Sequence, residues 1–283
     1  MPPHLIALDV DGTIVNYDGT LTAATHRVLT ELGAAGHHLV VSTGRALPGA
    51  LEVVHALGLT TGFVVCSNGS VVVRLDPELE NGWEMHHVVS FDPKDALLRM
   101  HAALPAALFL VEDPDLHRWA SGEFPPGELA ASDTLDIVSF EELLVKRATR
   151  IVMREVNGSA EEFAQAVDRL GLHEVSYSIG WSNWLDIAPD GVSKASALQL
   201  VEAELGIDHE LSVAAGDGLN DKEMLDWAEY AIVMGQAKEE LKELATVVAK
   251  TVDEDGLALE LVDRFDLGRS LLDATGETNT RGL

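Results

Sequence analysis

Cysteine is almost absent from this sequence. Cys66 is the only cysteine among 283 residues, so no disulfide can form within the chain. Such usage is typical of a reducing compartment. Cys66 lies in the apolar run GFVVC, where we expect a small buried side chain rather than a nucleophile. The composition therefore excludes a disulfide-stabilised fold and disfavours thiol chemistry.

Basic residues are scarce. The chain has 19 lysines and arginines against 47 aspartates and glutamates, which gives a formal net charge of −28 at pH 7. Because such a chain has no long-range attraction for a phosphate backbone or an anionic membrane face, we expect neither nucleic acid nor a membrane as partner. The acidity predicts a well-solvated surface, with attraction of metal cations as a secondary effect.

Long apolar runs are also absent. No uninterrupted run approaches the roughly 18 residues that a membrane helix needs, and the start MPPHLIALD does not read as a signal peptide. We therefore expect a cytoplasmic protein. The apolar fraction of 47% is ordinary for a globular chain, and the length favours two domains. A monomer and a homodimer are both compatible with the sequence.

Short apolar runs alternate with helical patterns at both ends of the chain. Consecutive apolar positions are typical of strands covered on both faces of a parallel sheet, and apolar residues spaced three to four apart predict helices. The predicted strands are 5–10, 38–42, 62–66, 211–215 and 231–234, and the predicted helices lie within 22–36, 46–57, 193–205 and 221–227. This alternation of strands and helices predicts one α/β domain built from both ends of the chain.

The middle of the chain has a different pattern. A polar stretch at 75–87 suggests a boundary. Beyond it we predict strands near 88–91, 107–112, 150–154, 174–179 and 185–188, helices near 93–103 and 159–170, and a hairpin through IGWSN. The predicted fold class is α/β, a Rossmann-like doubly wound parallel sheet core with an inserted α+β domain. The predicted core is 1–82 and 189–270, the insert is 83–188, and 271–283 form a disordered tail.

Two aspartates follow the first predicted strand, in HLIALDVDGTIVN. Asp9 and Asp11 lie where the strand ends, and ligands of open parallel sheets bind beyond the carboxyl ends of the strands. Two carboxylates this close repel each other unless a cation lies between them or one holds a proton. A helix cap or Asx turn is the alternative. We favour acid/base or covalent chemistry.

Two further motifs fit an anion. VVSTGR places the hydroxyl of Thr43 and the amide of Gly44 after the second strand, although a simple helix N-cap explains this motif equally well. PDGVSKASAL places Lys194 in the first turn of a helix, where the macrodipole disfavours a cation. An anion held between lysine and helix would offset that cost. A solvated lysine is the alternative.

The motif GDGLND follows another apolar strand. It packs Asp217, Asn220 and Asp221 into one turn before a helix. Paired acids with intervening glycines fit a hard divalent cation bound through oxygen. Together, the four motifs predict that a metal ion and a phosphate group meet at one sheet edge.

DVDGT, STGR, GVSK and GDGLND, in this order and at these separations, resemble the motifs of the haloacid dehalogenase (HAD) superfamily of phosphatases. The insert between the second and third motifs resembles the Cof-type, type IIB cap subfamily, and VDEDGLALELV resembles that subfamily's last helix. The resemblance implies a Mg²⁺-dependent phosphatase. Such an enzyme hydrolyses a small phosphorylated metabolite, such as a sugar phosphate, through an aspartyl-phosphate intermediate, and its insert acts as a cap.

The resemblance also implies residue roles. Asp9 corresponds to the nucleophile and Asp11 to the acid/base. The implied ligands of Mg²⁺ are the Asp9 side chain, the Asp11 backbone carbonyl and Asp217, with Asp221 in support. The implied phosphate-binding residues are Thr43, Gly44, Lys194 and Asn220.

The leaving group has several candidate contacts. They are Arg45 and Asn68 in the core, and Glu112, His117, Arg118, Trp119, Arg154 and Trp181 in the insert. A lone Trp or His is more often packing or surface, and no spacing selects among the insert residues. The particular substrate stays open.

Two rival functions use similar residues. A phosphotransferase or phosphomutase would pass the phosphoryl group from the same aspartate to a sugar. A non-catalytic regulatory module would bind phosphate in an acidic pocket. The second carboxylate, Asp11, and the inserted domain both disfavour the regulatory module, because they serve turnover and capture of a small molecule.

Overall fold

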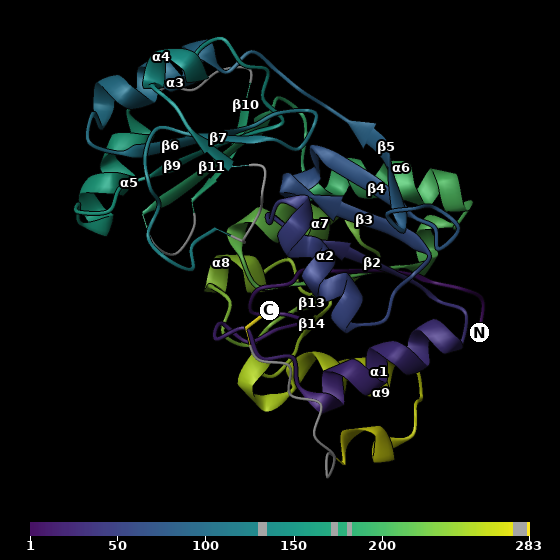
Figure 1. Cartoon of the computed structure of the whole chain (residues 1–283). Helices are drawn as coiled ribbons and strands as arrows, with labels where there is room; N and C mark the ends of the chain where they lie inside the picture. Colours follow the sequence, from purple (N-terminus) through teal and green to yellow (C-terminus); the bar gives the residue numbers. More distant parts are fainter. Residues whose placement is uncertain (130–134, 171–174, 180–182, 274–281) are drawn as a thin grey trace.

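The computed structural model describes residues 1–129, 135–170, 175–179, 183–273 and 282–283. Two sheets organise this part of the chain, and each has its own helices (Figure 1). The first sheet has eight strands in the order β14-β13-β12-β1-β2-β3-β4-β5. Its strands are β1 (Leu5–Leu8), β2 (His38–Ser42), β3 (Gly62–Cys66), β4 (Val71–Leu75), β5 (Trp83–Val88), β12 (Ser212–Gly216), β13 (Tyr230–Val233) and β14 (Val247–Val248).

Helices cover both faces of the first sheet. Alternate residues of β1 point to opposite faces, so Ile6 and Leu8 pack in one apolar cluster while Leu5 and Ala7 pack in the other. The first cluster includes α1 (Ala23–Ala34), α2 (Leu47–Ala56) and α9 (Gly256–Arg264), and the second includes α6 (Lys194–Leu205), α7 (Lys222–Trp227) and α8 (Glu239–Lys242). Strands β14 to β3 run parallel, which confirms the doubly wound α/β class.

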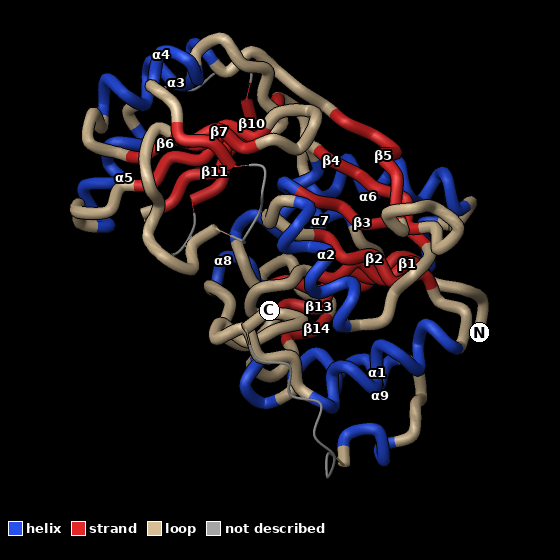
Figure 2. Tube along the Cα trace, viewed as in Figure 1, coloured by secondary structure: helices blue, strands red, loops and turns tan. Residues whose placement is uncertain are grey.

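The second sheet lies within the insert. Its six strands have the order β10-β11-β9-β6-β7-β8. They are β6 (Leu108–Glu112), β7 (Arg118–Ala120), β8 (Leu135–Ile137), β9 (Arg150–Arg154), β10 (Val175–Ile179) and β11 (Trp184–Pro189). Helices α3 (Lys94–Ala103), α4 (Phe140–Leu143) and α5 (Ala160–Asp168) cover the outer face, where Phe109, Ile151 and Phe163 form the core (Figures 1 and 2).

The largest difference from the sequence-based prediction is at the end of the first sheet. Strand β4 continues into β5 through a hairpin in which Leu75 pairs with Trp83, so the polar stretch at 76–82 is a turn inside this sheet. The strand predicted near 88–91 is wrong, because β5 ends at Val88 and Phe91 makes an isolated bridge. The domain limits remain a proposal, and the pairing of β5 favours a first boundary after Val88.

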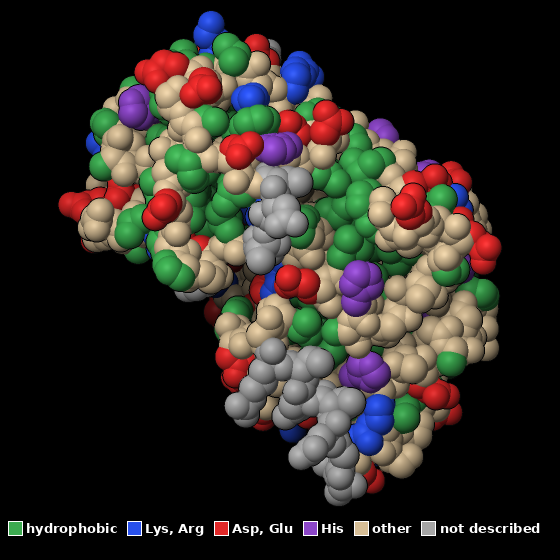
Figure 3. All heavy atoms as spheres, in the orientation of Figure 1, with side chains coloured by type: hydrophobic (Ala, Val, Ile, Leu, Met, Phe, Trp, Pro, Cys, Tyr) green, Lys and Arg blue, Asp and Glu red, His purple; other side chains and the backbone are tan. Residues whose placement is uncertain are grey.

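Other predicted features have mixed outcomes. Strands β10 and β11 pair antiparallel as expected, while the connection at 180–182 lies outside the described residues. In the tail predicted at 271–283, Leu271 and Leu272 pack against the first core, and 274–281 lie outside the described residues. Across the described ranges, no helix is long and apolar enough to cross a membrane. Acidic side chains are spread over the visible face of both units (Figure 3).

Candidate active site

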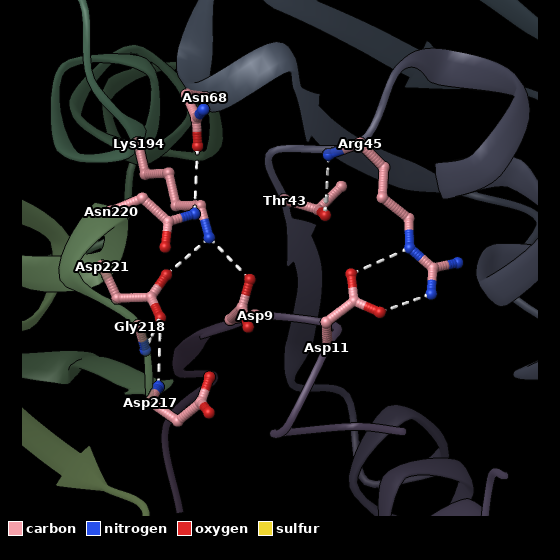
Figure 4. A network of polar contacts seen from close by, with 10 residues as sticks. All are labelled: Asp9, Asp11, Thr43, Arg45, Asn68, Lys194, Asp217, Gly218, Asn220 and Asp221. Carbon is pink, nitrogen blue, oxygen red and sulfur yellow. Dashed lines mark hydrogen bonds and ion pairs between the residues drawn. The ribbon is translucent and has the colours of Figure 1, made fainter. Parts of the chain in front are cut away.

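Polar residues of the motifs meet at one edge of the first sheet. Strand β1 ends directly before Asp9, β2 before Thr43, and β12 before Asp217. These strands are parallel, so their carboxyl ends lie at the same edge. The amide of Asp9 donates to the carbonyl of Ala215 (3.0 Å), which fixes the first aspartate beside β12. Figure 4 shows the resulting group of side chains.

Lys194 occupies the centre of this group. Its Nζ lies 2.6 Å from Asp9 Oδ1 and 2.5 Å from Asp221 Oδ1, and its side chain is fully buried. Ser193 caps helix α6 and holds Lys194 at the first helical position. Burial opposes the charge, but Asp221 and Asp9 outweigh it and raise the pKa of Lys194. A solvated lysine, the alternative from sequence, is therefore wrong.

Three carboxylates gather around one point. Asp9, Asp217 and Asp221 each offer one oxygen, and these oxygens all lie within 4.8 Å of one another. Burial, followed by repulsion from Asp221, raises the pKa of Asp9 well above its ordinary value. Burial likewise raises the pKa of Asp217 to about 6. A cation beside these oxygens would offset the cost of burying like charges.

Asp221 also builds the turn that contains Asp217. Its Oδ2 accepts hydrogen bonds from the amides of Asp217 (3.0 Å) and Gly218 (2.9 Å), while Oδ1 faces Lys194. Gly216 makes room for this arrangement, because a Cβ there would lie 2.7 Å from the Cβ and Cγ of Asp221. The glycines and the last acid of GDGLND thus have a structural purpose as well as a chemical one.

The Asp11 side chain stands apart from the three carboxylates. It accepts two hydrogen bonds from Arg45, with 3.0 Å from Nε to Oδ2 and 2.6 Å from Nη2 to Oδ1. Arg45 is anchored in turn by the carbonyl of Gly49 at 3.3 Å. The Asp11 side chain is half exposed. Arg45 therefore contacts the carboxylate that we expect to act as acid and base. The predicted link between Asp11 and a metal ion runs only through the Asp11 backbone carbonyl.

Three of the predicted phosphate-binding residues, Thr43, Gly44 and Asn220, lie near Asn68, where the loops after β2, β3 and β12 meet. Asn220 Nδ2 donates to Asn68 Oδ1 (3.1 Å), and a Cβ on Gly44 would lie 3.1 Å from the same oxygen. Thr43 Oγ1 accepts from the amide of Arg45 (3.1 Å). Asn68 has φ +53° and its neighbour Ser67 has φ +50°. Two consecutive left-handed residues other than glycine are strained, and such strain clusters at functional sites.

The insert reaches this site through Glu112. Ser67 Oγ donates to Glu112 Oε1 at 2.5 Å, and Glu112 lies between Arg118 and Arg150 on the neighbouring strands. Arg150 pairs with Asp186 at 2.5 Å. Burial raises the pKa of Glu112, and Arg150 opposes that rise. On the face of the insert sheet opposite its helices, Glu112 and its charged neighbours form a group that joins the core beside Asn68. Leu110, Ala120 and Val152 form a small apolar cluster on the same face.

The remaining insert candidates have other contacts. Arg154 forms hydrogen bonds to both carboxylate oxygens of Glu128, at 2.7 to 3.1 Å. His117 Nε2 lies 2.9 Å from Asp136, and Trp119 packs on the helix-covered face of the sheet. These contacts hold each residue within the insert. Trp181 lies outside the described residues.

Sequence reasoning missed two residues that contact Asp217. The Tyr17 hydroxyl donates to Asp217 Oδ2, and Gln236 Nε2 lies 3.3 Å from the same oxygen. Tyr17 is 200 positions from Asp217, and Gln236 follows a different strand. No spacing rule in a single sequence could have joined them.

Comparisons with known proteins agree with this geometry. The model of the haloacid dehalogenase-like hydrolases matches residues 6–261. YkrA of Bacillus subtilis (strain 168) is 29% identical over 274 residues, which cover 91% of this chain and 96% of that protein. The 5-amino-6-(5-phospho-D-ribitylamino)uracil phosphatase YitU of the same organism is 24% identical over 269 residues, which cover 94% of this chain and 98% of YitU. The solved structure of a HAD subclass IIB sugar phosphatase has a TM-score of 0.76 at 21% identity, and the match covers 93% of this chain and 99% of that one.

The chain belongs to the haloacid dehalogenase-like hydrolase family, because the family match spans most of its length. Within that family it is a Cof-type phosphatase, as its motifs and inserted unit predicted.

Proposed function

We propose that the protein hydrolyses the phosphate monoester of a small metabolite with Mg²⁺ as its cofactor. The single observation behind this proposal is a group of three carboxylates, two of them paired with buried Lys194, at the carboxyl edge of a parallel sheet. A phosphate monoester is an anion that aspartates alone would repel. Lysine and a divalent cation reverse the local sign of charge, so an acidic protein can bind an anionic substrate at this one place.

The donor set fits Mg²⁺. Carboxylate and carbonyl oxygens are the ligands this ion prefers, with water completing the octahedron. Asp9, the backbone carbonyl of Asp11 and Asp217 would hold the ion, and Asp221 would support Asp217 through the turn. Bound there, Mg²⁺ would neutralise charge on the phosphoryl oxygens.

The chain's own residues supply the chemical steps. For the first half, Asp11 has to enter protonated, with one of its oxygens released from Arg45. A carboxylate oxygen of Asp9 attacks phosphorus, the bond from phosphorus to the leaving oxygen breaks, and Asp11 gives that oxygen its proton. In the second half, Asp11 takes a proton from the water that attacks phosphorus. The phosphorus–Asp9 bond then breaks, which releases inorganic phosphate and restores both carboxyl groups.

The surrounding residues orient the phosphoryl group. Lys194 stabilises the extra negative charge of the transition state from its buried position. Gly44 and Asn220 lie against Asn68. Together with Thr43 they would offer an amide, a carboxamide and a hydroxyl to the phosphoryl oxygens. Arg45 holds the Asp11 carboxylate at the entrance, where a leaving group would enter.

The substrate class is inferred from the position and charge of the insert residues beside the site. Glu112 joins the charged group of the insert sheet to the core beside Asn68, so we infer that the leaving group lies near that junction. The arginines of this group have acidic neighbours, which favours a polar leaving group with little net charge. The name of YitU, a phosphatase of a ribityl phosphate, agrees with a phosphorylated polyol or sugar.

The test is phosphate release from a panel of phosphorylated metabolites, with Mg²⁺ or EDTA. We expect metal-dependent turnover in the wild type and a loss of at least about a thousandfold in Asp9→Asn. Asp168→Asn, the same change on an exposed helix position of the insert, is the matched control and should keep full activity.

The same assay separates the rival functions. A phosphotransferase would need a sugar acceptor and would not release phosphate in step with substrate consumption. A regulatory module would accumulate a long-lived aspartyl-phosphate in the wild type. Folded wild type that turns over nothing on a broad panel would contradict the proposed hydrolysis.

A further inference from the structure

Gln236 connects three distant segments at the edge of the site. Its Nε2 donates to the carbonyl of Gly12 (2.6 Å) and to Asp217 Oδ2 (3.3 Å), and its Oε1 accepts from the amide of Val252 (3.0 Å). The three partners come from the loop after β1, the loop after β12 and the turn before α9. One side chain thus ties the chain's first and last motifs to a candidate metal ligand.

The partners of Gln236 fix the orientation of its amide. The backbone N–H of Val252 can only donate, so the oxygen of Gln236 has to face it. The NH₂ group then points to the Gly12 carbonyl and the Asp217 carboxylate, which can only accept. Gln236 is therefore an oriented donor, and its direction is set by a backbone group that does not belong to the site.

Tyr17 donates to the same oxygen of Asp217 from the opposite end of the chain. Gly12 lies between these groups with φ +81°, and a Cβ there would collide with Asp217 Oδ2 and would lie 2.8 Å from the Tyr17 hydroxyl. The loop after β1 therefore closes tightly on Asp217. Both donors engage Oδ2, so neither uses Oδ1.

We propose that Gln236 and Tyr17 are positioning residues that hold Asp217 Oδ2, so that the carboxylate presents Oδ1 to the divalent cation. The inference rests on the proposed function, because it assigns Asp217 as a metal ligand. A carboxylate fixed by two donors loses less rotational freedom when it binds the ion. Removing hydrogen-bonding partners of metal ligands typically weakens metal affinity by about 10- to 100-fold.

The experiment measures Mg²⁺ affinity directly, by calorimetric titration of the full chain without substrate. We expect Gln236→Met, which keeps the length of the side chain and removes the donor, to raise the Kd by about 10-fold or more. Tyr17→Phe should raise it by about threefold, since a hydrogen bond to a partly exposed group contributes less. Gln165→Met, on an exposed face of α5, should leave the Kd unchanged.

A second measurement separates positioning from general damage. In the activity assay, the Mg²⁺ concentration for half-maximal rate should rise in Gln236→Met, while saturating Mg²⁺ should restore most of kcat. A structural defect would lower kcat at every Mg²⁺ concentration and would contradict the inference. Thermal melts in EDTA check the folding of each variant.

The outcomes distinguish this inference from the proposed function. If the wild type binds no Mg²⁺, both the proposed metal site and the positioning role of Gln236 and Tyr17 are refuted. If the wild type binds Mg²⁺ and both variants bind within twofold of it, the site stands and the positioning role is overturned. If Gln236→Met does not fold, Tyr17→Phe decides alone, because it leaves the hydrogen bond between Gln236 and Val252 in place.

Discussion

Replacing Lys194 by methionine should lower the free energy of unfolding, because the buried carboxylates of the site would lose their cation. The ammonium group lies between two buried carboxylates, at 2.6 Å from Asp9 and 2.5 Å from Asp221. Methionine has a similar length and no charge, so the variant would leave both carboxylates buried without their cation. Removing one partner from a buried ion pair typically costs about 3–5 kcal/mol.

Thermal unfolding in EDTA converts this cost into a measurable shift. For a chain of this size, about 1 kcal/mol corresponds to about 2–4 °C, so Lys194→Met should melt roughly 6–20 °C below the wild type. Phosphatase activity should fall by at least about a hundredfold, because the variant also lacks a donor to the transition state.

A matched change identifies what the shift means. Lys242 pairs with Glu239 at 2.8 Å on the surface of α8, so Lys242→Met should shift the melting temperature by no more than about 2 °C. If Lys194→Met melts within 2 °C of the wild type, then the two carboxylates do not depend on the lysine. The electrostatic reasoning about the site would then be refuted.

Two more predictions concern stability. Gly216→Ala should lower the free energy of unfolding by about 1–3 kcal/mol and reduce activity, because the new methyl group overlaps Asp221. Gly268→Ala is the control, and it should leave the melting temperature unchanged because the nearest neighbour of the new methyl group is 3.5 Å away. An equal loss of stability in both variants would contradict the packing argument. Burial lowers the pKa of His4 and His37, so at these two positions the unfolded chain binds protons first and their contribution to stability should fall as the pH drops below about 6.5. Asp217, whose pKa burial raises to about 6, contributes in the opposite direction, but equally in the wild type and in a variant that lacks both histidines. Urea unfolding between pH 8 and 5.5 should show this slope, and the double variant His4→Leu/His37→Leu should flatten it; an unchanged slope would show that other groups cause it.

The parallel part of the first sheet could be predicted because its strands are buried on both faces. Such strands appear as consecutive apolar residues, and the predicted limits of β2 and β3 agree with the structure. Strand β5 could not be found this way. It is an edge strand with half-exposed residues in the order WEMHHV, so its backbone pairing with β4, rather than an apolar pattern, makes it a strand.

The local part of the site was predictable for a similar reason. Thr43 directly follows the predicted strand 38–42, so finding that strand finds the residue. Asp9 lies within the predicted strand 5–10, which in the structure ends at Leu8, and Asp217 follows β12, which ends one residue beyond the predicted 211–215. Gln236 and Glu112 contribute through partners more than 15 positions away, and only the folded chain shows those partners. The assigned roles of the site residues, the cytoplasmic location and the oligomeric state stay predictions.

Parallel pairing of β1 with β12 brings Asp9 next to a strand that begins more than 200 residues later. All of the insert lies between these two strands along the chain. During synthesis, β1 therefore has no neighbour on that side until the insert has been made, and the insert has its own apolar core with which to fold first. We expect that no fragment ending before residue 216 can assemble the three carboxylates. The enzyme would then acquire its charge cluster only once Asp221 has been made, later than the part of the chain that covers it.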